Sequence, residues 1–529
     1  MKKILLSSIL LLVFFTSTLA AQTLAEAQKL LTYEKYNSAI SAFEKLAAAK
    51  PNDAETLLYL GNAYTIAKRP EEAKATYGKL MSVDAKNPFS QIGVARINAI
   101  GKNAENTVAA LQSAIKLSKK KNPAIYRWAI ATLLMLDKPN TELAIAWGTK
   151  ATELDKSDKS YMALGDAFYA SQNAGKAVSQ YEYAIEKNKT NPEPYYKIGV
   201  IWVQAKNEDL AVKSLKQAIT LDPNFAPAYR RLGDFYYNTY RFNTATANYE
   251  KYMQLGEPSL EDWMQYANSL YLAEDYEKAI TTIQDIIKKD ASKNYLNRLI
   301  GYSYYKTEKY AEGLDFMAKF MENVPADKTL NSDYEYYGKL LLKNNKPDEA
   351  IPLLNKAYEG DTSKKVRADI AGLIADHYSD QKNYPEAIKY YELKISNLEK
   401  PVAQDFYDLG GTYYSSKDYK KADSLFTLVV NLRPDATVGY IWRAKSNARL
   451  ESNENPSGLA KPHYEKFIEV ATKDPETFEK QKKNIIESYN YLAYYYYKTN
   501  DYVNARLYCQ KVLELDASNA QATNIIKAL

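Results

Sequence analysis

The stretch from Asn191 to Pro223 reads NPEPYYKIGVIWVQAKNEDLAVKSLKQAITLDP, and it decides the fold. Apolar and small residues recur in it at steps of three and four, the spacing of an amphipathic helix face. They are Tyr195, Ile198, Gly199, Trp202, Ala211, Leu215 and Ala218. The pair Lys206-Asn207 interrupts this spacing and predicts a turn. The stretch therefore predicts two helices joined by a short turn, a helical hairpin.

The same pattern returns along the chain at a step of 34 residues. Small residues keep this step in two runs, and a second small residue follows most of them by twelve positions. The first set is Ala27, Gly61, Ala95, Gly165, Gly199, Gly233, Ala267 and Gly301, and the second is Ala39, Ala73, Ala177, Ala211, Ala245, Ala279 and Gly313. Because a larger side chain would force two backbones apart, two small positions per repeat predict two helices in close contact.

The pattern resembles the tetratricopeptide repeat, in which an aromatic residue, a Leu-Gly pair and a tyrosine precede a helix with alanine and a second aromatic. The repeat with Tyr229, Leu232-Gly233, Tyr236, Ala245 and Tyr249 carries these features in order. The resemblance implies an all-α fold, an α-solenoid of about fourteen helix-turn-helix hairpins that form a superhelix. The structural repeat markers are then Gly61, Gly165, Gly199, Gly233, Gly301 and Gly410.

Changes in spacing along the chain predict its organisation. Later markers stand at Gly338, Ala375, Gly410, Ala444 and Ala493, where the step departs from 34 and reaches 49 before Ala493. We expect a signal peptide over 1–21, N-terminal repeats over 22–122, a degenerate repeat over 123–157, a regular array over 158–325, C-terminal repeats over 326–450, an insertion with an extra helix over 451–485, and the last repeat with a capping helix over 486–529.

The first residues have the pattern of a secretory leader. Lys2-Lys3 precede an apolar stretch from Ile4 to Phe15, and small residues follow at Ala20 and Ala21. Such a segment predicts cleavage after Ala20 or Ala21 and a periplasmic or secreted protein. The only cysteine is Cys509, so we expect neither a lipoprotein anchor nor an internal disulfide. We expect no direct membrane insertion after the leader is removed.

Tyrosine and arginine mark the face on which a solenoid of this family receives its ligands. Counting the small marker as position eight of the repeat, position twelve is tyrosine in six repeats. Tyrosine gives large contact area at low entropic cost, and arginine adds charge. The concave-face binding candidates are Tyr169, Arg230, Tyr237, Tyr271, Arg298, Tyr302, Tyr305, Tyr414 and Tyr497. A second candidate surface is the insertion that begins at Glu451.

Neither the composition nor the motifs favour catalysis or nucleic-acid binding. The formal net charge is only +6 over 529 residues, and the one dense basic run, Lys119-Lys120-Lys121, falls in a predicted turn. The two histidines, His377 and His463, lie in different repeats, and no nucleophile, dinucleotide or phosphate-loop motif occurs. We therefore predict no enzyme activity, no cofactor, no metal site and no nucleic-acid partner.

The remaining functional hypotheses concern polypeptides. The leading prediction is a non-catalytic scaffold or adaptor of the bacterial cell envelope that binds partner proteins or peptides on its concave face. The alternative is a periplasmic chaperone-like protein that binds many extended polypeptides weakly. A carbohydrate-binding protein or an enzyme is a third reading, which would need an acidic or metal constellation that the sequence does not show.

Overall fold

Every element of the structure is helical. The computed structural model describes residues 23–529, so the predicted signal peptide lies outside the described residues. These residues form 29 α-helices and two 3₁₀ segments without any strand. Consecutive helices pair as fourteen antiparallel hairpins, and a last short helix follows them. The predicted α-solenoid of about fourteen hairpins is confirmed.

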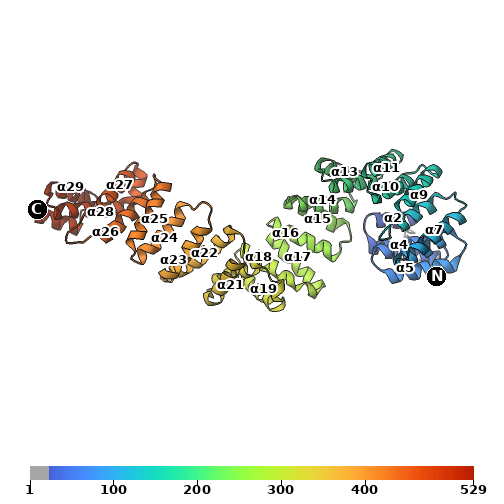
Figure 1. The fold of residues 1–529 in the computed structure, drawn as a ribbon, viewed down its shortest axis with the longest axis horizontal. Helices are drawn as coiled ribbons and strands as arrows, with labels where there is room; N and C mark the ends of the chain where they lie inside the picture. The colour runs from blue at the N-terminus through green and yellow to red at the C-terminus, as the bar shows by residue number, and fades with distance from the viewer. Residues whose placement is uncertain (1–22) are drawn as a thin grey trace, which may run out of the picture. The chain divides into compact units, whose positions relative to one another are not determined.

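The chain divides into two compact units, and the first ends at Lys293. Within this unit the chain curves round, so that its first helices, in blue, lie near later ones, in green (Figure 1). Its helices are α2 (Leu24–Thr32), α3 (Tyr36–Ala49), α4 (Ala54–Ile66), α5 (Pro70–Val83), α6 (Pro88–Ile100), α7 (Ala104–Leu117), α8 (Pro123–Leu133), α9 (Thr141–Leu154), α10 (Asp158–Ala170), α11 (Ala174–Lys187), α12 (Glu193–Gln204), α13 (Glu208–Leu221), α14 (Ala226–Asn238), α15 (Phe242–Leu255), α16 (Leu260–Leu272) and α17 (Tyr276–Lys289).

The second unit runs from Asn294 to Leu529. A 3₁₀ segment, η1 (Ala291–Leu296), precedes its first helix. Its elements are α18 (Asn297–Lys306), α19 (Tyr310–Asn323), η2 (Ala326–Lys328), α20 (Asn331–Lys343), α21 (Pro347–Gly360), α22 (Lys364–Asp380), α23 (Tyr384–Asn397), α24 (Ala403–Ser415), α25 (Tyr419–Leu432), α26 (Thr437–Leu450), α27 (Lys461–Ala471), α28 (Pro475–Lys498), α29 (Tyr502–Leu515) and α30 (Ala520–Ala528). The helix α30 packs on α28 and α29, where the sequence predicts a capping helix.

Twelve of the fourteen hairpin turns use one residue in the left-handed region, followed by the residue that starts the next helix; the turns between α8 and α9 and between α26 and α27 do not. Between α12 and α13, Lys206 has φ 55°, and the Asn207 side chain accepts a hydrogen bond from the amide of Leu210. The left-handed residue ends one helix, and the asparagine satisfies a free amide at the start of the next. The turn predicted at Lys206-Asn207 is therefore confirmed.

The small marker of each repeat lies directly under the side chain sixteen residues later. A methyl group on Gly165 would lie 2.7 Å from Cδ1 of Tyr181, and one on Gly199 would lie 2.7 Å from Cγ of Leu215. Tyr181 and Leu215 are fully buried. The absence of a side chain at the marker lets the two helices of a hairpin approach closely, as the 34-residue pattern predicts.

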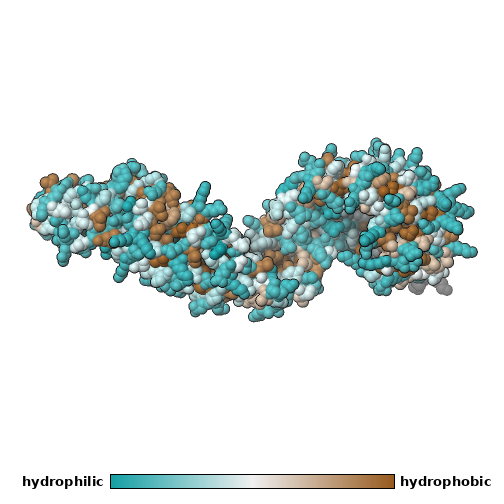
Figure 2. Space-filling model, in the orientation of Figure 1, coloured by the Kyte–Doolittle hydropathy of each residue, from teal (hydrophilic) through white to brown (hydrophobic). Residues whose placement is uncertain are grey.

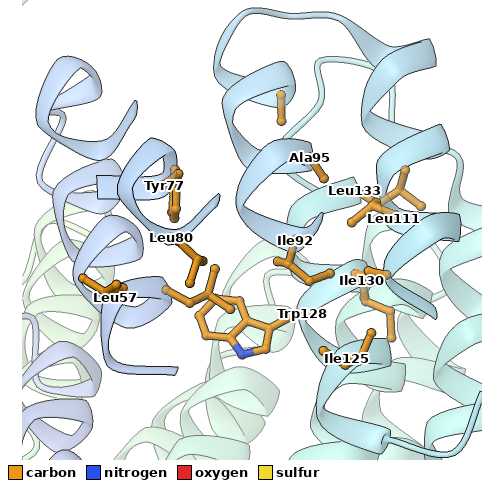
Figure 3. Close-up of a cluster of buried hydrophobic side chains, with 14 of the residues drawn as sticks. Leu57, Tyr77, Leu80, Ile92, Ala95, Leu111, Ile125, Trp128, Ile130 and Leu133 are labelled. Atoms are coloured by element: carbon orange, nitrogen blue, oxygen red, sulfur yellow. The ribbon is translucent and has the colours of Figure 1, made fainter. Parts of the chain in front are cut away.

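Adjacent hairpins share buried apolar clusters, each of which spans several helices. In Figure 3, Leu80 of α5 and Trp128 of α8 lie beside Ile92 of α6. Leu80 and Ile92 are fully buried. The outer surface visible in Figure 2 is mostly hydrophilic, with scattered hydrophobic patches. None of the helices between residues 23 and 529 combines the length and the apolar character that crossing a bilayer requires.

Replacing the marker glycine by leucine will destabilise its hairpin. The variant Gly165→Leu overpacks the buried Tyr181 ring, so we expect the free energy of unfolding to fall by roughly 1–3 kcal/mol. Gly175→Leu, in the second helix of the same hairpin, is the matched control because a methyl group there meets nothing within 4 Å. Urea denaturation of both variants measures the difference, and equal stability would contradict the close approach.

Candidate protein-binding site

A cavity of about 690 Å³ opens on the second unit, between the first helices of three successive repeats. Helices α24, α26 and α28 contribute most of its walls, and the connection after α26 closes one side. It is lined by Tyr414, Lys445, Ala448, Arg449, Glu451, Asn453, Tyr464, Lys483, Ile486, Glu487, Asn490, Tyr491, Tyr494 and Gln521. These are the first helices of their hairpins, the same set of helices that carries the predicted concave-face candidates.

Glu451 fastens the connection between α26 and α27 to the cavity wall. Its carboxylate accepts a hydrogen bond of 2.6 Å from the amide of Ala460 and one of 3.2 Å from the amide of Gly458. The Tyr491 hydroxyl of α28 donates to the same carboxylate over 2.9 Å. Burial raises the pKa of Tyr491, and the hydrogen bond to Glu451 raises it further. One acidic side chain therefore holds the segment 451–460 as a wall of the cavity.

The extra length between the Ala444 and Ala493 markers lies in two places. One is the segment 451–460, which replaces the usual short turn between α26 and α27. The other is the start of α28, a helix of 24 residues that contains the stretch predicted as an extra helix around Pro475–Lys483. Both additions border the cavity, since Asn453 and Lys483 line it.

Part of the charge in the cavity is already paired. The Lys445 ammonium lies 3.2 Å from the Glu487 carboxylate and donates to the side-chain oxygen of Asn484. The phenol of Tyr464 is buried beside Glu487, and burial, followed by that carboxylate, raises its pKa. The cavity thus has a fixed polar floor, which is formed by Lys445, Glu487 and Tyr464.

Three polar groups of the cavity can still contact a ligand, although Arg449 already makes a hydrogen bond to Tyr414. Arg449 and Lys483 are exposed, and within residues 23–529 no ion pair joins either of them to a carboxylate. The side-chain oxygen of Asn490 is buried without a hydrogen-bond donor. A buried acceptor without a donor is costly, and a ligand N–H would remove that cost. The cavity therefore offers two cations and one acceptor between tyrosine rings.

The predicted tyrosines at position twelve mostly close their own hairpins. The rings of Tyr237, Tyr271 and Tyr305 each lie 5.7 Å from the aromatic ring five residues later, at the start of the second helix. Tyr414 and Tyr497 make the same contact at 5.2 and 6.4 Å. The position-twelve tyrosines are all half-buried. Their recurrence is explained by this turn contact.

The remaining member of that set, Tyr169, has alanine five residues later and packs instead on a buried cluster around Tyr181. Two of the other tyrosines also reach the next repeat. Tyr305 contacts the ring of Tyr336 at 5.4 Å, and Tyr414 contacts that of Trp442 at 5.0 Å. These rings join consecutive hairpins.

Arg298 and Tyr302 join consecutive repeats through one buried acid. The Arg298 guanidinium lies 3.3 Å from Asp333, which is fully buried, and the Tyr302 hydroxyl donates to the same carboxylate. The Tyr302 ring stacks on Tyr336 at 4.1 Å. Arg230 likewise lies 3.8 Å from Asp262 at the start of the next first helix, and it also binds Glu34. These three candidates hold the array together.

Of the nine predicted candidates, only Tyr414 lines the cavity. The other lining residues were missed because Lys445, Arg449 and Lys483 do not recur in the repeat pattern. The signal that could have found them is the break in that pattern. The insertion is the second predicted candidate surface, and its first residue, Glu451, holds the wall of the cavity.

Comparisons with known proteins agree with this architecture. Profiles described as tetratricopeptide repeat match residues 30–91, 162–239, 338–396 and 486–519. A profile of the anaphase-promoting complex, cyclosome, subunit 3 matches residues 238–320. The chain belongs to the tetratricopeptide-repeat family. Repeats of this family form protein-binding scaffolds and are typically non-catalytic.

Similar curated proteins share only part of their length with this chain. A TPR repeat-containing protein of Methanocaldococcus jannaschii is 23% identical over 40% of this chain and 39% of its own length. The small glutamine-rich tetratricopeptide repeat-containing protein 2 of Mycosarcoma maydis is 31% identical over 19% of this chain and 28% of its own. The peroxisomal targeting signal receptor of Pichia angusta is 23% identical over 33% of this chain and 32% of its own. The chain thus spans less than half the length of these relatives.

Among solved structures, the C-terminal part of a TPR repeat-containing protein from Cytophaga hutchinsonii is 34% identical. The match covers 49% of this chain and 98% of that one, with a TM-score of 0.41.

Removing the Glu451 carboxylate will free the wall of the cavity. In Glu451→Ala we expect the amides of Gly458 and Ala460 to exchange hydrogen at least about tenfold faster, because each loses its acceptor. Glu454→Ala, a change in an exposed acid of the same segment, is the control. Hydrogen-exchange mass spectrometry measures both, and unchanged protection in Glu451→Ala would contradict the fastening role.

Proposed function

We propose that this protein is a non-catalytic scaffold that binds a segment of a partner protein in the cavity of the second unit. The observation that carries the proposal is a set of three groups there. They are the cations of Arg449 and Lys483, which have no ion pair within residues 23–529, and the acceptor of Asn490, which is buried without a donor. Cations select carboxylates, and the acceptor selects an N–H group. A polypeptide segment with an acidic side chain supplies both.

The walls of the cavity suit the same ligand. Tyr414, Tyr491 and Tyr494 present ring surface that can pack against a peptide backbone and its side chains. Tyr491 and Tyr494 are held by hydrogen bonds to Glu451 and to the carbonyl of Asn453, so binding does not have to order them. A pre-arranged aromatic cavity favours one defined partner segment over many loosely bound chains.

A selection from a random peptide library tests the proposal. We expect the full chain to enrich acidic peptides, and replacing glutamate by glutamine in them to weaken binding about tenfold or more, because charge-assisted hydrogen bonds are lost. The variant Arg449→Ala/Lys483→Ala should lose this enrichment. Arg506→Ala/Lys527→Ala removes the same charge from exposed positions on α29 and α30 and should retain it.

The same selection distinguishes the scaffold from the chaperone-like alternative. Enrichment of acidic peptides by wild type and control, but not by the cavity variant, supports the scaffold. Weak retention of many uncharged extended peptides by all three proteins would contradict it and favour the chaperone-like reading.

We also propose that the scaffold acts in the cell envelope or outside the cell. The support is the leader pattern of Lys2-Lys3, the apolar stretch and the small residues at Ala20 and Ala21. The family relationship is compatible with any compartment, so the proposal rests on this pattern alone.

The mass of the protein purified from its native cells tests the leader. We expect the mature chain to begin at Ala21 or Gln22, since a leader peptidase cleaves after small residues. Intact-mass spectrometry and N-terminal sequencing of the extracellular and periplasmic fractions measure this. Recovery of the uncleaved chain of 60.1 kDa would contradict it.

A further inference from the structure

In the first unit, the N-terminal hairpin contacts helices about 200 residues further along the chain. The Tyr33 ring lies edge-on to Phe225 with a centroid distance of 5.7 Å, and its hydroxyl donates to Asp222. Lys29 also lies 3.6 Å from Asp222. These contacts join the end of α2 to the connection between α13 and α14. They close the curve of the first unit that Figure 1 shows.

The residue after Tyr33 adds a buried ion pair to this contact. Glu34 has φ 58° at the hairpin turn, and its carboxylate accepts a 2.9 Å hydrogen bond from Arg230 of α14. Its side chain is 13% exposed. Burial raises the pKa of Glu34, whereas Arg230 lowers it and nearby Asp262 raises it. The concave-face candidate Arg230 is thus occupied by the chain's own N-terminal turn.

The start of α3 is completed by a residue from a distant repeat. Its N-cap residue, Lys35, makes no side-chain hydrogen bond to the free amides of the first turn. The Glu257 carboxylate, from the connection between α15 and α16, accepts from the amides of Asn37 at 2.7 Å and Ser38 at 3.1 Å. It also accepts from the Ser38 hydroxyl. A carboxylate at a helix N-terminus satisfies free amides and complements the helix dipole.

Five of the seven other second helices of the first unit carry this cap locally, whereas α5 and α15 begin after Arg69 and Arg241 without a side-chain cap. Among these caps, Asn103, Asn173, Asn207 and Asp275 each accept a hydrogen bond from the first turn of the helix that they precede. The α3 helix has lysine at this position, and its cap comes from 219 residues away. What distinguishes α3 is that a carboxylate from a distant repeat binds its free amides.

We propose that the N-terminal hairpin is a clasp that holds the first unit closed and covers the Arg230 position of its concave face. The clasp consists of Tyr33, Glu34 and Ser38 on the hairpin, with Asp222, Arg230 and Glu257 as their partners. Its ring contact with Phe225 belongs to a buried apolar cluster, and its ion pairs and hydrogen bonds are the part that salt can weaken. Opening frees Arg230 for a ligand carboxylate.

The distance across the clasp measures its state directly. Spin labels at Glu26→Cys and Asn224→Cys of the full chain, both exposed positions, report it by pulsed electron paramagnetic resonance. The native Cys509 is buried and lies in the other unit. We expect one short distance in the labelled protein at low salt. Raising the salt concentration should add a second, longer distance because it screens the ion pairs.

Matched charge-neutral variants identify the contacts responsible. Glu34→Gln/Glu257→Gln should populate the longer distance at low salt. Glu208→Gln, which breaks the exposed ion pair with Arg241 in the same unit, should leave the single short distance. Circular dichroism checks that each variant is folded. A single unchanged distance in the wild type at every salt concentration, or equal behaviour of the clasp and control variants, would overturn the proposal.

Discussion

The rest of the structure depends on the close approach of the two helices inside each hairpin. A small residue on the first helix lies against the side chain sixteen positions later, as Gly165 lies against Tyr181 and Gly199 against Leu215. In three repeats that side chain is a tyrosine whose hydroxyl donates to the aspartate after the small marker. Tyr181 donates to Asp166 over 2.7 Å in this way. Tight packing therefore fixes a polar group on the first helix as well as an apolar core.

The same geometry decides which residues are left to bind anything else. Residues that recur with the repeat, such as Tyr237 and Tyr305, contact the start of their own second helix. Residues that break the repeat, such as Glu451 and Arg449, line the cavity of the second unit. In a repeat protein the pattern maintains the array, and departures from the pattern supply the individual binding chemistry.

The sequence is sufficient to predict the hairpins because each depends on contacts within 34 residues. The turn at Lys206-Asn207 and the register of Gly199 follow from local spacing alone. The role of Arg230 does not, since its partner Glu34 lies 196 residues away and meets it only because the superhelix curves round. The sequence does not predict the cavity either, because the cavity forms only when the segment after Glu451 folds back on α28. Long-range curvature and an irregular loop leave no periodic signal.

Because the cap of α3 lies far along the chain, the helix is synthesised well before the residue that caps it. Ser38 and Glu257 are 219 residues apart, so a chain made from its N-terminus at about 5–20 residues per second presents the cap roughly 10–40 seconds after the helix that needs it. Until then the first amides of α3 are bonded to water. The hairpin that is synthesised first is therefore completed late, when the seventh repeat of the first unit has followed it.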